Sequence, residues 1–436
     1  MDSELNSIGY KISLKSIPPH FLEDIRNELT VKPLENPNFP SNESAFPVFR
    51  ISKTSIYLPR FYALEKYGIP KKNTIADGES INLNFTGTLR DIQEQTIEST
   101  LKAFETHGGG LVSLDTGLGK TVVALKLISL MKVKTLIIVH AEFLLEQWKD
   151  RILQFLPDAR IGIIRQDRCE NENVDISIGM IQTIIKREYS KDFFKSYGMI
   201  TIDECHHISS RTFSSIFYKV QTKYMLGLSA TPERKDGLSK VIYWFLGPQI
   251  ITIKRDTGKP SITFVFNDTD GYTEDFNRLG KINNPAMITS LTKKNNRNEL
   301  IVNVIKNYLK FNRKILVLSD RRDHCDYLLK QLHIEGISAG VYLGGMKTKN
   351  REETVICSVI IGTYQASGEG FDVPELDTLI LATPKSDVEQ AVGRILRQKN
   401  KNEPIVVDIV DSFSIFKGQY YKRRKFYKSC DFKLNK

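Results

Sequence analysis

One stretch of sequence restricts the fold of this chain more than any other: an apolar run that ends in a glycine-rich turn and continues into a helical pattern. The run covers Gly110–Leu114, the turn reads DTGLGKT over residues 115–121, and the helical pattern covers Val122–Met131. In this order, the N–H groups of the turn and the positive end of the helix surround phosphate oxygens. The sequence therefore predicts a phosphate-binding loop between a strand and a helix, with contacts from Thr116, Gly117, Leu118, Gly119, Lys120 and Thr121.

The last two residues of this loop carry specific expectations. Lys120 is expected to reach the β- and γ-phosphates of ATP, and Thr121 to ligate a magnesium ion. Leu114 stands where the strict pattern has glycine, so an ordinary glycine-rich turn with an incidental lysine is the alternative. The intact TGLGKT sequence favours the phosphate site, and ATP and magnesium are the expected cofactors.

A second apolar run, Met199–Ile202, ends in the residues DECHH. Two acids at the end of a buried strand are costly unless they hold a cation or do chemistry. Asp203 is expected to complete the magnesium shell, and Glu204 to orient or deprotonate the attacking water; a plain acidic cap before a helix is the alternative. His206 is expected to relay the state of the nucleotide rather than to bind a metal, because no second Cys/His cluster lies at ligand spacing.

The same alternation of apolar runs and helical stretches extends over most of the chain. Between residues 85 and 255 the strand-like runs are 110–114, 135–139, 161–164, 176–180, 199–202 and 225–228. After the Asn-, Asp-, Thr- and Gly-rich stretch 266–298, the runs are 315–318, 339–342, 359–362, 378–381 and 404–409. Continuous apolar runs between helices predict buried parallel strands, so the fold class is expected to be α/β with two tandem parallel-sheet domains.

The expected domain ranges are 1–84, 85–255 and 256–436. Residues 1–84 are punctuated by prolines and predict a small α+β accessory domain that could contact DNA. The two larger ranges predict α/β domains with a ligand-binding cleft between them. The five cysteines form no CxxC pair, no window approaches 18 apolar residues, and the N-terminus lacks a secretory pattern, so we expect a cytosol-like compartment with no membrane partner. A monomer is the expected state, although none of these features bears on it.

Charge is concentrated at the C-terminus. The net charge of the chain is +11, and residues 417–436 contain eight basic residues and one acid, a local charge of +7. Aromatic residues lie between these cations, which suits contacts to phosphates with stacking on bases or sugars. The alternative is a solvated C-terminal helix whose aromatic side chains pack on its own domain.

The second half contains two arginines three residues apart, Arg394 and Arg397, in the sequence QAVGRILR that begins at Gln390. On a helix both would face one side, where they could supply cations to the γ-phosphate; solvated surface arginines are the alternative. Gly370 and Asp372 lie shortly before them, and Asp372 could accept a hydrogen bond from a ribose hydroxyl or cap a turn.

Taken together and in order, these motifs resemble those of the superfamily 2 helicases and translocases, from Leu89 to Arg397. Arg90 and Gln93 resemble the adenine-side glutamine motif, and residues 144–148 (LLEQW) resemble motif Ia. Residues 227–237 (GLSATPERKDG) resemble the branch that contains the repair and transcription helicase XPB, phage UvsW-type branch-migration helicases and viral transcript-release helicases. Two departures concern motif contacts: residues 140–141 replace Pro-Thr in motif Ia, and Ala391 replaces arginine in motif VI.

The resemblance implies two RecA-like domains that close around Mg-ATP and move along a nucleic-acid strand. It assigns strand contacts and residues that couple the nucleotide to the strand. The implied strand contacts are Gln147, Thr183, Ser319 and Thr363, and the implied coupling residues are Ser229, Ala230 and Thr231. The phosphate site, Asp203, Glu204, His206, Gln390, Arg394 and Arg397 are the implied catalytic set.

The sequence therefore predicts an ATP-dependent DNA helicase or translocase that separates strands or migrates branches. The alternatives are a translocase without unwinding, acting in transcript release, an RNA helicase, and a non-catalytic scaffold. The expected partners are single-stranded, forked or branched DNA, with RNA polymerase or recombination and replication proteins as candidates. The resemblance and the Lys-, Asn- and Ile-rich composition fit a viral or phage protein of the host cytoplasm or virion.

Overall fold

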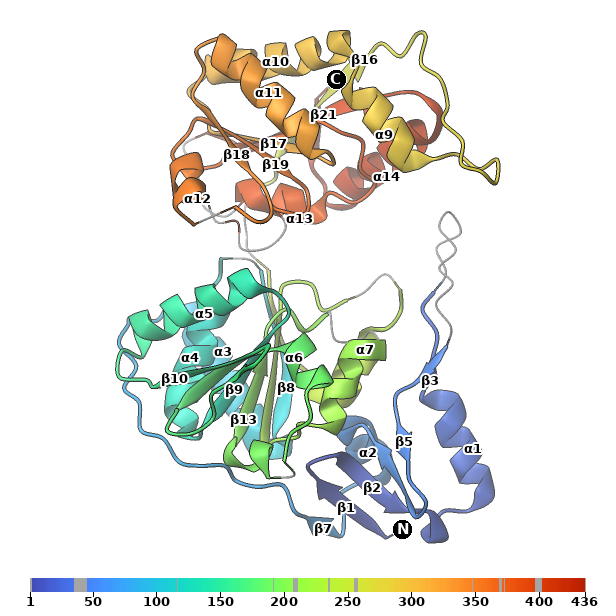
Figure 1. Ribbon diagram of the computed structural model, residues 1–436, viewed down its shortest axis with the longest axis vertical. Coiled ribbons are helices and arrows are strands. Elements are labelled where there is room, and N and C mark those ends of the chain that lie inside the picture. The colour runs from blue at the N-terminus through green and yellow to red at the C-terminus, as the bar shows by residue number, and fades with distance from the viewer. Residues whose placement is uncertain are drawn as a thin grey trace. The chain divides into compact units, whose positions relative to one another are not determined.

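The computed structural model describes residues 2–34, 45–115, 117–190, 192–206, 211–233, 236–254, 258–346, 348–367, 371, 373–396 and 402–435. The chain forms two compact units, residues 1–255 and 256–436 (Figure 1). No helix in these ranges is long and apolar enough to cross a membrane.

An eight-stranded sheet forms the centre of the first unit, in the order β11-β10-β12-β9-β13-β14-β8-β15. Its strands are β8 (Gly109–Leu114), β9 (Thr135–Val139), β10 (Ile161–Arg165), β11 (Arg168–Cys169), β12 (Ile176–Met180), β13 (Met199–Ile202), β14 (Tyr224–Ser229) and β15 (Gln249–Ile253). All neighbouring strands are parallel except β10 and β11, which form an antiparallel pair.

Helices cover both faces of this sheet (Figure 1). The helices on one face are α3 (Asp91–His107), α4 (Lys120–Met131) and α5 (Glu142–Phe155), and those on the other are α6 (Ile181–Lys186), α7 (Arg211–Ser214) and α8 (Ser239–Leu246). Along β9, Ile137 packs toward α3–α5, whereas Leu136 and Ile138 pack toward the opposite face. Because both faces of the central strands are buried, those strands are largely apolar, which makes them recognisable in the sequence.

A second, smaller sheet belongs to the N-terminal segment, in the order β5-β6-β2-β1-β7. Its strands are β1 (Ser3–Asn6), β2 (Gly9–Ser13), β5 (Arg50–Ile51), β6 (Ser55–Leu58) and β7 (Lys72–Asn73), accompanied by the β3 (Thr30–Val31) and β4 (Phe46–Pro47) pair, α1 (Pro19–Glu28) and α2 (Arg60–Tyr67). The segment thus has the expected α+β character. It shares one compact unit with the large sheet, and a domain border at residue 84 stays a prediction.

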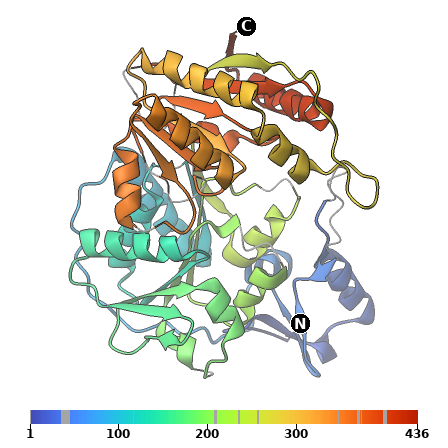
Figure 2. The same cartoon turned by 45° about the horizontal axis from the view of Figure 1, so that its top comes forward.

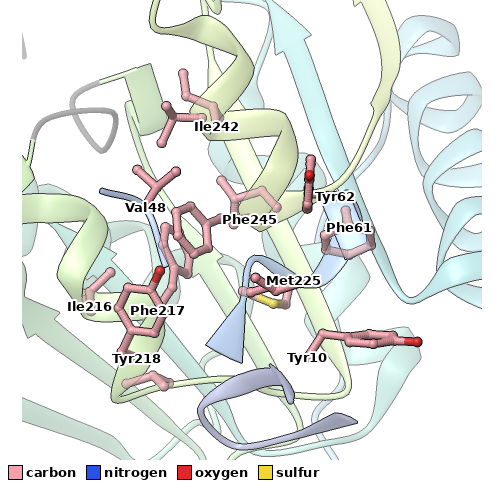
Figure 3. Close-up of a cluster of buried hydrophobic side chains, with 14 of the residues drawn as sticks. Tyr10, Val48, Phe61, Tyr62, Ile216, Phe217, Tyr218, Met225, Ile242 and Phe245 are labelled. Atoms are coloured by element: carbon pink, nitrogen blue, oxygen red, sulfur yellow. The ribbon is translucent and has the colours of Figure 1, made fainter. Parts of the chain in front are cut away.

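Aromatic side chains join the N-terminal segment to the large sheet. Phe61 and Tyr62 of α2 share a buried cluster with Phe245 of α8 and with Phe217, which lies in a short 3₁₀ turn (Figure 3). The Tyr62 ring meets the Trp244 ring edge-on, with the ring centres 5.5 Å apart. These contacts make α2 part of the core that covers this face of the sheet.

Arg60, the first residue of α2, ties this segment to the sheet through the backbone. It is buried, and its guanidinium donates to the carbonyls of Thr222 (2.9 Å), Lys223 (3.2 Å) and His107 (3.1 Å). Burial lowers the pKa of Arg60 to about 10, so the side chain remains charged at neutral pH. The three carbonyls lie just before β14 and at the end of α3, and one side chain satisfies all of them.

We expect Arg60→Met to lower the free energy of unfolding of the first unit by at least about 2 kcal/mol, because buried carbonyls lose their donor. Arg26→Met is the matched control, since Arg26 is exposed on α1. The measurement is denaturant unfolding followed by tryptophan fluorescence, which reports the first unit because both tryptophans, Trp148 and Trp244, lie there. Equal stability of the two variants would contradict the anchoring role of Arg60.

The second unit contains a seven-stranded, fully parallel sheet in the order β18-β19-β17-β20-β21-β16-β22. Its strands are β16 (Ser261–Asn267), β17 (Ile315–Ser319), β18 (Ala339–Tyr342), β19 (Val359–Thr363), β20 (Thr378–Leu381), β21 (Ile405–Asp411) and β22 (Lys433–Asn435). Its helices are α9 (Asn284–Thr292), α10 (Asn295–Leu309), α11 (Arg322–Ile334), α12 (Thr348–Val355), α13 (Glu389–Val392) and α14 (Ser414–Ser429). Two of them, α10 and α11, pack side by side on one face (Figure 2), and α13 and α14 pack on the other.

The predicted α/β class with two parallel-sheet units is confirmed. One local expectation differs from the structure. The two arginines were considered on one helix, but α13 ends at Val392, and Gly393–Leu396, which include Arg394, form a 3₁₀ turn. Glycine is a poor α-helix former, and it stands at the change of helix type.

Candidate functional site

Polar side chains of the first unit gather where β13, β14 and β8 end. These strands are neighbours in the parallel sheet. The phosphate loop follows β8, Asp203 and Glu204 follow β13, and Ser229 is the last residue of β14. Because the carboxyl ends of parallel strands meet at one edge, three distant segments of sequence are brought together there, at the usual ligand position of such sheets.

The phosphate loop depends on glycine at two positions. Gly117 has φ 82° and Gly119 has φ 90°, a left-handed conformation that favours glycine. A Cβ atom on Gly119 would lie 2.2 Å from Nε2 of Gln93. Gln93 lies this close because its Nε2 donates to the Leu118 carbonyl (3.1 Å). Nη2 of Arg90 likewise donates to the Gly117 carbonyl (3.3 Å). Arg90 and Gln93 therefore brace the loop backbone.

Lys120 is the first residue of α4, and its side chain is largely buried. Its ammonium donates to the Leu114 carbonyl (3.3 Å) and lies 3.6 Å from Oε1 of Glu204. Thr121 follows on the first turn of α4 and is half-buried. The positive end of the helix and one ammonium thus point to the same edge as the acids.

Asp203 and Glu204 differ in their surroundings. Oδ2 of Asp203 accepts from Nε1 of Trp148 (2.9 Å), and Oδ1 accepts from the Glu204 backbone N–H (3.0 Å). Burial and the Glu204 charge raise the pKa of Asp203 to about 6, whereas Lys120 and the Trp148 hydrogen bond lower it. Glu204 has φ 47°, which costs a non-glycine residue about 1–2 kcal/mol and is typical of functional positions.

His206 connects the acids to the end of β14. Its Nδ1 lies 3.4 Å from Oε2 of Glu204 and 3.1 Å from Oγ of Ser229. Oγ of Ser229 also accepts from the backbone N–H of Thr231 (3.1 Å). One imidazole therefore contacts both the Glu204 carboxylate and the last residue of β14, and the coupling role of Ser229, Ala230 and Thr231 stays a prediction.

These residues fit a magnesium-bound triphosphate. The Thr121 hydroxyl and the Asp203 carboxylate could supply oxygen ligands for a hard cation, and Gln93 and Arg90 hold the loop backbone in the glycine-dependent conformation that such phosphate loops require. Lys120 supplies the compensating charge. The assignment of these residues to ATP and magnesium remains a prediction about individual side chains.

Among the predicted strand contacts, Gln147 is exposed on α5, and Thr183 lies on α6 with its hydroxyl accepting from the Gln166 N–H (3.0 Å). Ser319 is fully buried, and its hydroxyl bonds Nδ1 of His324 (2.9 Å). Thr363 is half-buried, with its hydroxyl accepting from the Ala366 N–H. Contact of Ser319 with a strand would require its hydroxyl to become accessible, and all four contacts stay predictions.

Of the remaining residues of the second unit, Arg394 is buried and donates to the Phe371 carbonyl (2.8 Å), and Gln390 is exposed at the start of α13. Gln390 lines a hollow together with Asp320, Tyr364 and Lys385. The predicted residues Thr116, Gly370, Asp372 and Arg397 lie outside the described residues.

The residue that sequence reasoning missed is Trp148. It is fully buried on α5, and its indole N–H holds one oxygen of Asp203. The available signal was the LLEQW sequence, in which only Gln147 was given a role. A tryptophan next to a predicted strand contact could equally have been a core residue, and only the fold places it against the acid.

Comparison with known proteins identifies two helicase regions. The family model described as "Type III restriction enzyme, res subunit" matches residues 86–234, and the one described as "Helicase conserved C-terminal domain" matches residues 293–399. The crystal structure of T4 UvsW matches with a TM-score of 0.41 and 17% identity, covering 100% of this chain and 99% of that chain.

Viral proteins are similar over most of their length. A protein of Acanthamoeba polyphaga mimivirus named "Putative ATP-dependent RNA helicase L396" is 32% identical, covering 100% of this chain and 86% of that protein. "Putative helicase 161L" of Invertebrate iridescent virus 6 is 29% identical, with 96% and 97% covered. An African swine fever virus protein named "Putative ATP-dependent RNA helicase QP509L" is 28% identical, with 79% and 72% covered.

Proposed function

The chain belongs to the superfamily 2 helicases, and on that premise we propose that it uses ATP hydrolysis to move on DNA and to separate strands or migrate branches. The family makes it a nucleic-acid-dependent ATPase. The choice of DNA rests on residues 227–237, whose SATPERKDG sequence resembles the XPB and UvsW branch. Within that element, Arg234 and Lys235 lie outside the described residues.

In this proposal the first unit holds the nucleotide and activates the water. Magnesium-bound ATP supplies the bond that breaks and a cation that neutralises the phosphates. Thr121 and Asp203 would hold the metal, and Lys120 would bind the phosphate oxygens. Glu204 would accept the proton of the attacking water, with its carboxylate oriented by Lys120 on one oxygen and His206 on the other.

The proposal that hydrolysis is coupled to movement rests on one observation. The imidazole of His206 contacts both Glu204 and Ser229. A protonated Nδ1 can donate to the carboxylate or to the serine oxygen, whereas an unprotonated Nδ1 can only accept from the serine hydroxyl. A change of charge at Glu204 would favour one of these arrangements. The backbone at Thr231, which donates to Ser229, would follow that choice.

An RNA-directed activity is the second candidate, because the printed names of the mimivirus and African swine fever virus relatives call them RNA helicases. Phosphate contacts such as those proposed for Gln147 and Thr363 do not distinguish DNA from RNA. RNA polymerase, in transcript release, and recombination or replication proteins stay predicted partners.

The test is steady-state ATP hydrolysis at one salt concentration without nucleic acid and with single-stranded DNA, duplex DNA, four-way junction DNA and single-stranded RNA. We expect DNA to raise the turnover several-fold, and junctions to raise it most. Strand separation is then measured on forked DNA with a labelled strand. Stimulation by RNA alone would overturn the DNA assignment, and hydrolysis in none of the mixtures would revive the scaffold alternative.

A further inference from the structure

Helix α14 of the second unit has two faces of opposite character. Its sequence, SIFKGQYYKRRKFYKS, contains six basic residues and no acid. Phe416, Arg423 and Tyr427 are buried against the unit. The remaining cations are exposed, and they are Lys417, Lys422, Arg424, Lys425 and Lys428. These five residues are called the basic face.

The buried side fixes how the helix is rotated. The guanidinium of Arg423 donates through Nε and Nη2 to the two oxygens of Asp408, at 2.8 Å each, and through Nη1 to the Lys385 carbonyl (2.7 Å). The Tyr427 hydroxyl donates to the same carboxylate (3.1 Å). With these side chains turned inward, the basic face is held toward solvent.

No acid of the described ranges forms an ion pair with the basic face. The acids near the ends of the helix have other partners. Glu274 accepts from the Ser414 hydroxyl, and Asp431 pairs with Lys259. Within the described residues, the positive charge of the basic face is therefore not neutralised by an acidic side chain.

Positions 417, 421, 424 and 428 follow a helical repeat and form one stripe. The stripe extends for roughly 16 Å, which is close to five nucleotide steps of one strand in a duplex. Tyr421 lies in its middle and is 52% exposed, while the neighbouring Tyr420 packs on Phe264 and Phe266. An exposed ring between cations suits stacking of a base between phosphate contacts.

The helix also reaches the strand ends that carry predicted contacts. Arg423 holds the backbone of Lys385, whose ammonium lies 3.0 Å from Oδ1 of Asp320. Asp320 directly follows Ser319 of β17, and Lys385 shares a hollow with Tyr364, which follows Thr363. The basic face thus begins close to the end of the sheet where Ser319 and Thr363 lie.

We infer that the basic face of α14 and Tyr421 form a second nucleic-acid site, which binds the phosphate backbone and stacks one base independently of sequence. A membrane is the less suitable occupant, since a membrane-bound helix needs its apolar face free for lipid, and that face is buried here. The inference rests on the proposed function, because a second strand contact serves an enzyme that already moves on nucleic acid.

The test compares the wild type with a variant in which Lys417, Arg424, Lys425 and Lys428 are replaced by Gln, a residue of similar helix propensity. Binding of fluorescent single-stranded DNA and RNA is measured by anisotropy between about 50 and 200 mM salt. We expect the slope of log K against log salt to become shallower by about 3, because each lost single-strand phosphate contact removes about 0.7. ATP turnover without nucleic acid should be unchanged, since no residue of the ATP site is altered.

A matched control removes four exposed lysines elsewhere in the same unit, Lys281, Lys293, Lys310 and Lys330, and should leave the slope near that of the wild type. Tyr421→Leu should weaken binding by roughly 5- to 150-fold with an unchanged slope, because stacking is not ionic. An unchanged slope in the α14 variant, or an equal change in the control, would overturn the site.

Cosedimentation with phosphatidylserine vesicles completes the test. If the α14 variant lost vesicle binding while keeping the wild-type slope on DNA and RNA, the occupant would be a membrane and the inference wrong. Failure of the proposed function has a separate signature, because DNA would then not raise the ATP turnover of the wild type, whatever the binding slopes.

Discussion

Glu204→Gln is expected to lower ATP turnover by about 10²- to 10⁴-fold, the usual contribution of a general base, while ATP still binds. The amide cannot accept the proton of the attacking water. Gln keeps the size and backbone preference of Glu at the left-handed position, so the change tests the carboxylate rather than the turn. ATP binding is measured by calorimetric titration, and turnover by phosphate release with saturating nucleic acid.

Two controls separate chemistry from folding in this experiment. Glu105→Gln removes the same charge at an exposed position of α3 and should keep wild-type turnover. Lys120→Ala should weaken ATP binding itself, because it removes the ammonium next to the loop. A Glu204→Gln protein that hydrolysed ATP at nearly the wild-type rate would show that another group takes the proton.

The first α/β sheet was predictable from sequence because its strands are buried on both faces. The expected bounds of β9, β12 and β13 are those of the structure, since each is a largely apolar run between polar or helical segments. The partly exposed strands β15 and β16 were not predicted, although residues 262–266 of β16 also form a largely apolar run. Their pairing is decided by neighbours that are distant in the chain.

The ATP site was predictable as a set of residues but not as a geometry. Glycine spacing and the position of acids after a strand indicated Lys120 and Glu204. Nothing local indicated that Trp148 would hold Asp203, or that His206 would lie between Glu204 and Ser229. These contacts depend on the order of strands in the sheet, which a single sequence leaves open.

The packing of the C-terminal segment could likewise not be predicted from the sequence. Its composition left open whether the aromatic residues would be exposed to nucleic acid or would pack inward. In the structure, some pack inward and one is exposed. Phe426 and Tyr427 pack in the second unit, while Tyr421 is left exposed. The decisive contact is the buried pair of Arg423 and Asp408, two residues that sequence reasoning had no basis to connect.

Arg297→Met is expected to destabilise the second unit by about 3–5 kcal/mol, the usual effect of breaking a buried ion pair. Arg297 and Asp411 are both fully buried, and Nε and Nη2 of the guanidinium donate to the two carboxylate oxygens at 2.9 and 2.8 Å. Without the arginine, the carboxylate keeps the Asn267 amide as a hydrogen-bond donor (2.7 Å) but has no opposite charge. An uncompensated buried charge is more costly than the loss of the contact itself.

The double variant Arg297→Met/Asp411→Asn tests that reason. It removes both charges and leaves an acceptor for Asn267, so it should be more stable than Arg297→Met alone. Arg278→Met, an exposed arginine of the same unit, is the control. If the double variant were as unstable as the sum of its single changes, the cost would lie in packing rather than in charge.

The distribution of tryptophan makes this effect measurable in the intact chain. Both tryptophans belong to the first unit, so their fluorescence does not report unfolding of the second unit, whereas far-ultraviolet circular dichroism reports unfolding of both. Arg297→Met should therefore move part of the dichroism transition to lower denaturant and leave the fluorescence transition in place; Arg60→Met should do the reverse. If Arg297→Met shifted both transitions equally, the two units would unfold as one, and the free energy could not be assigned to the buried pair alone.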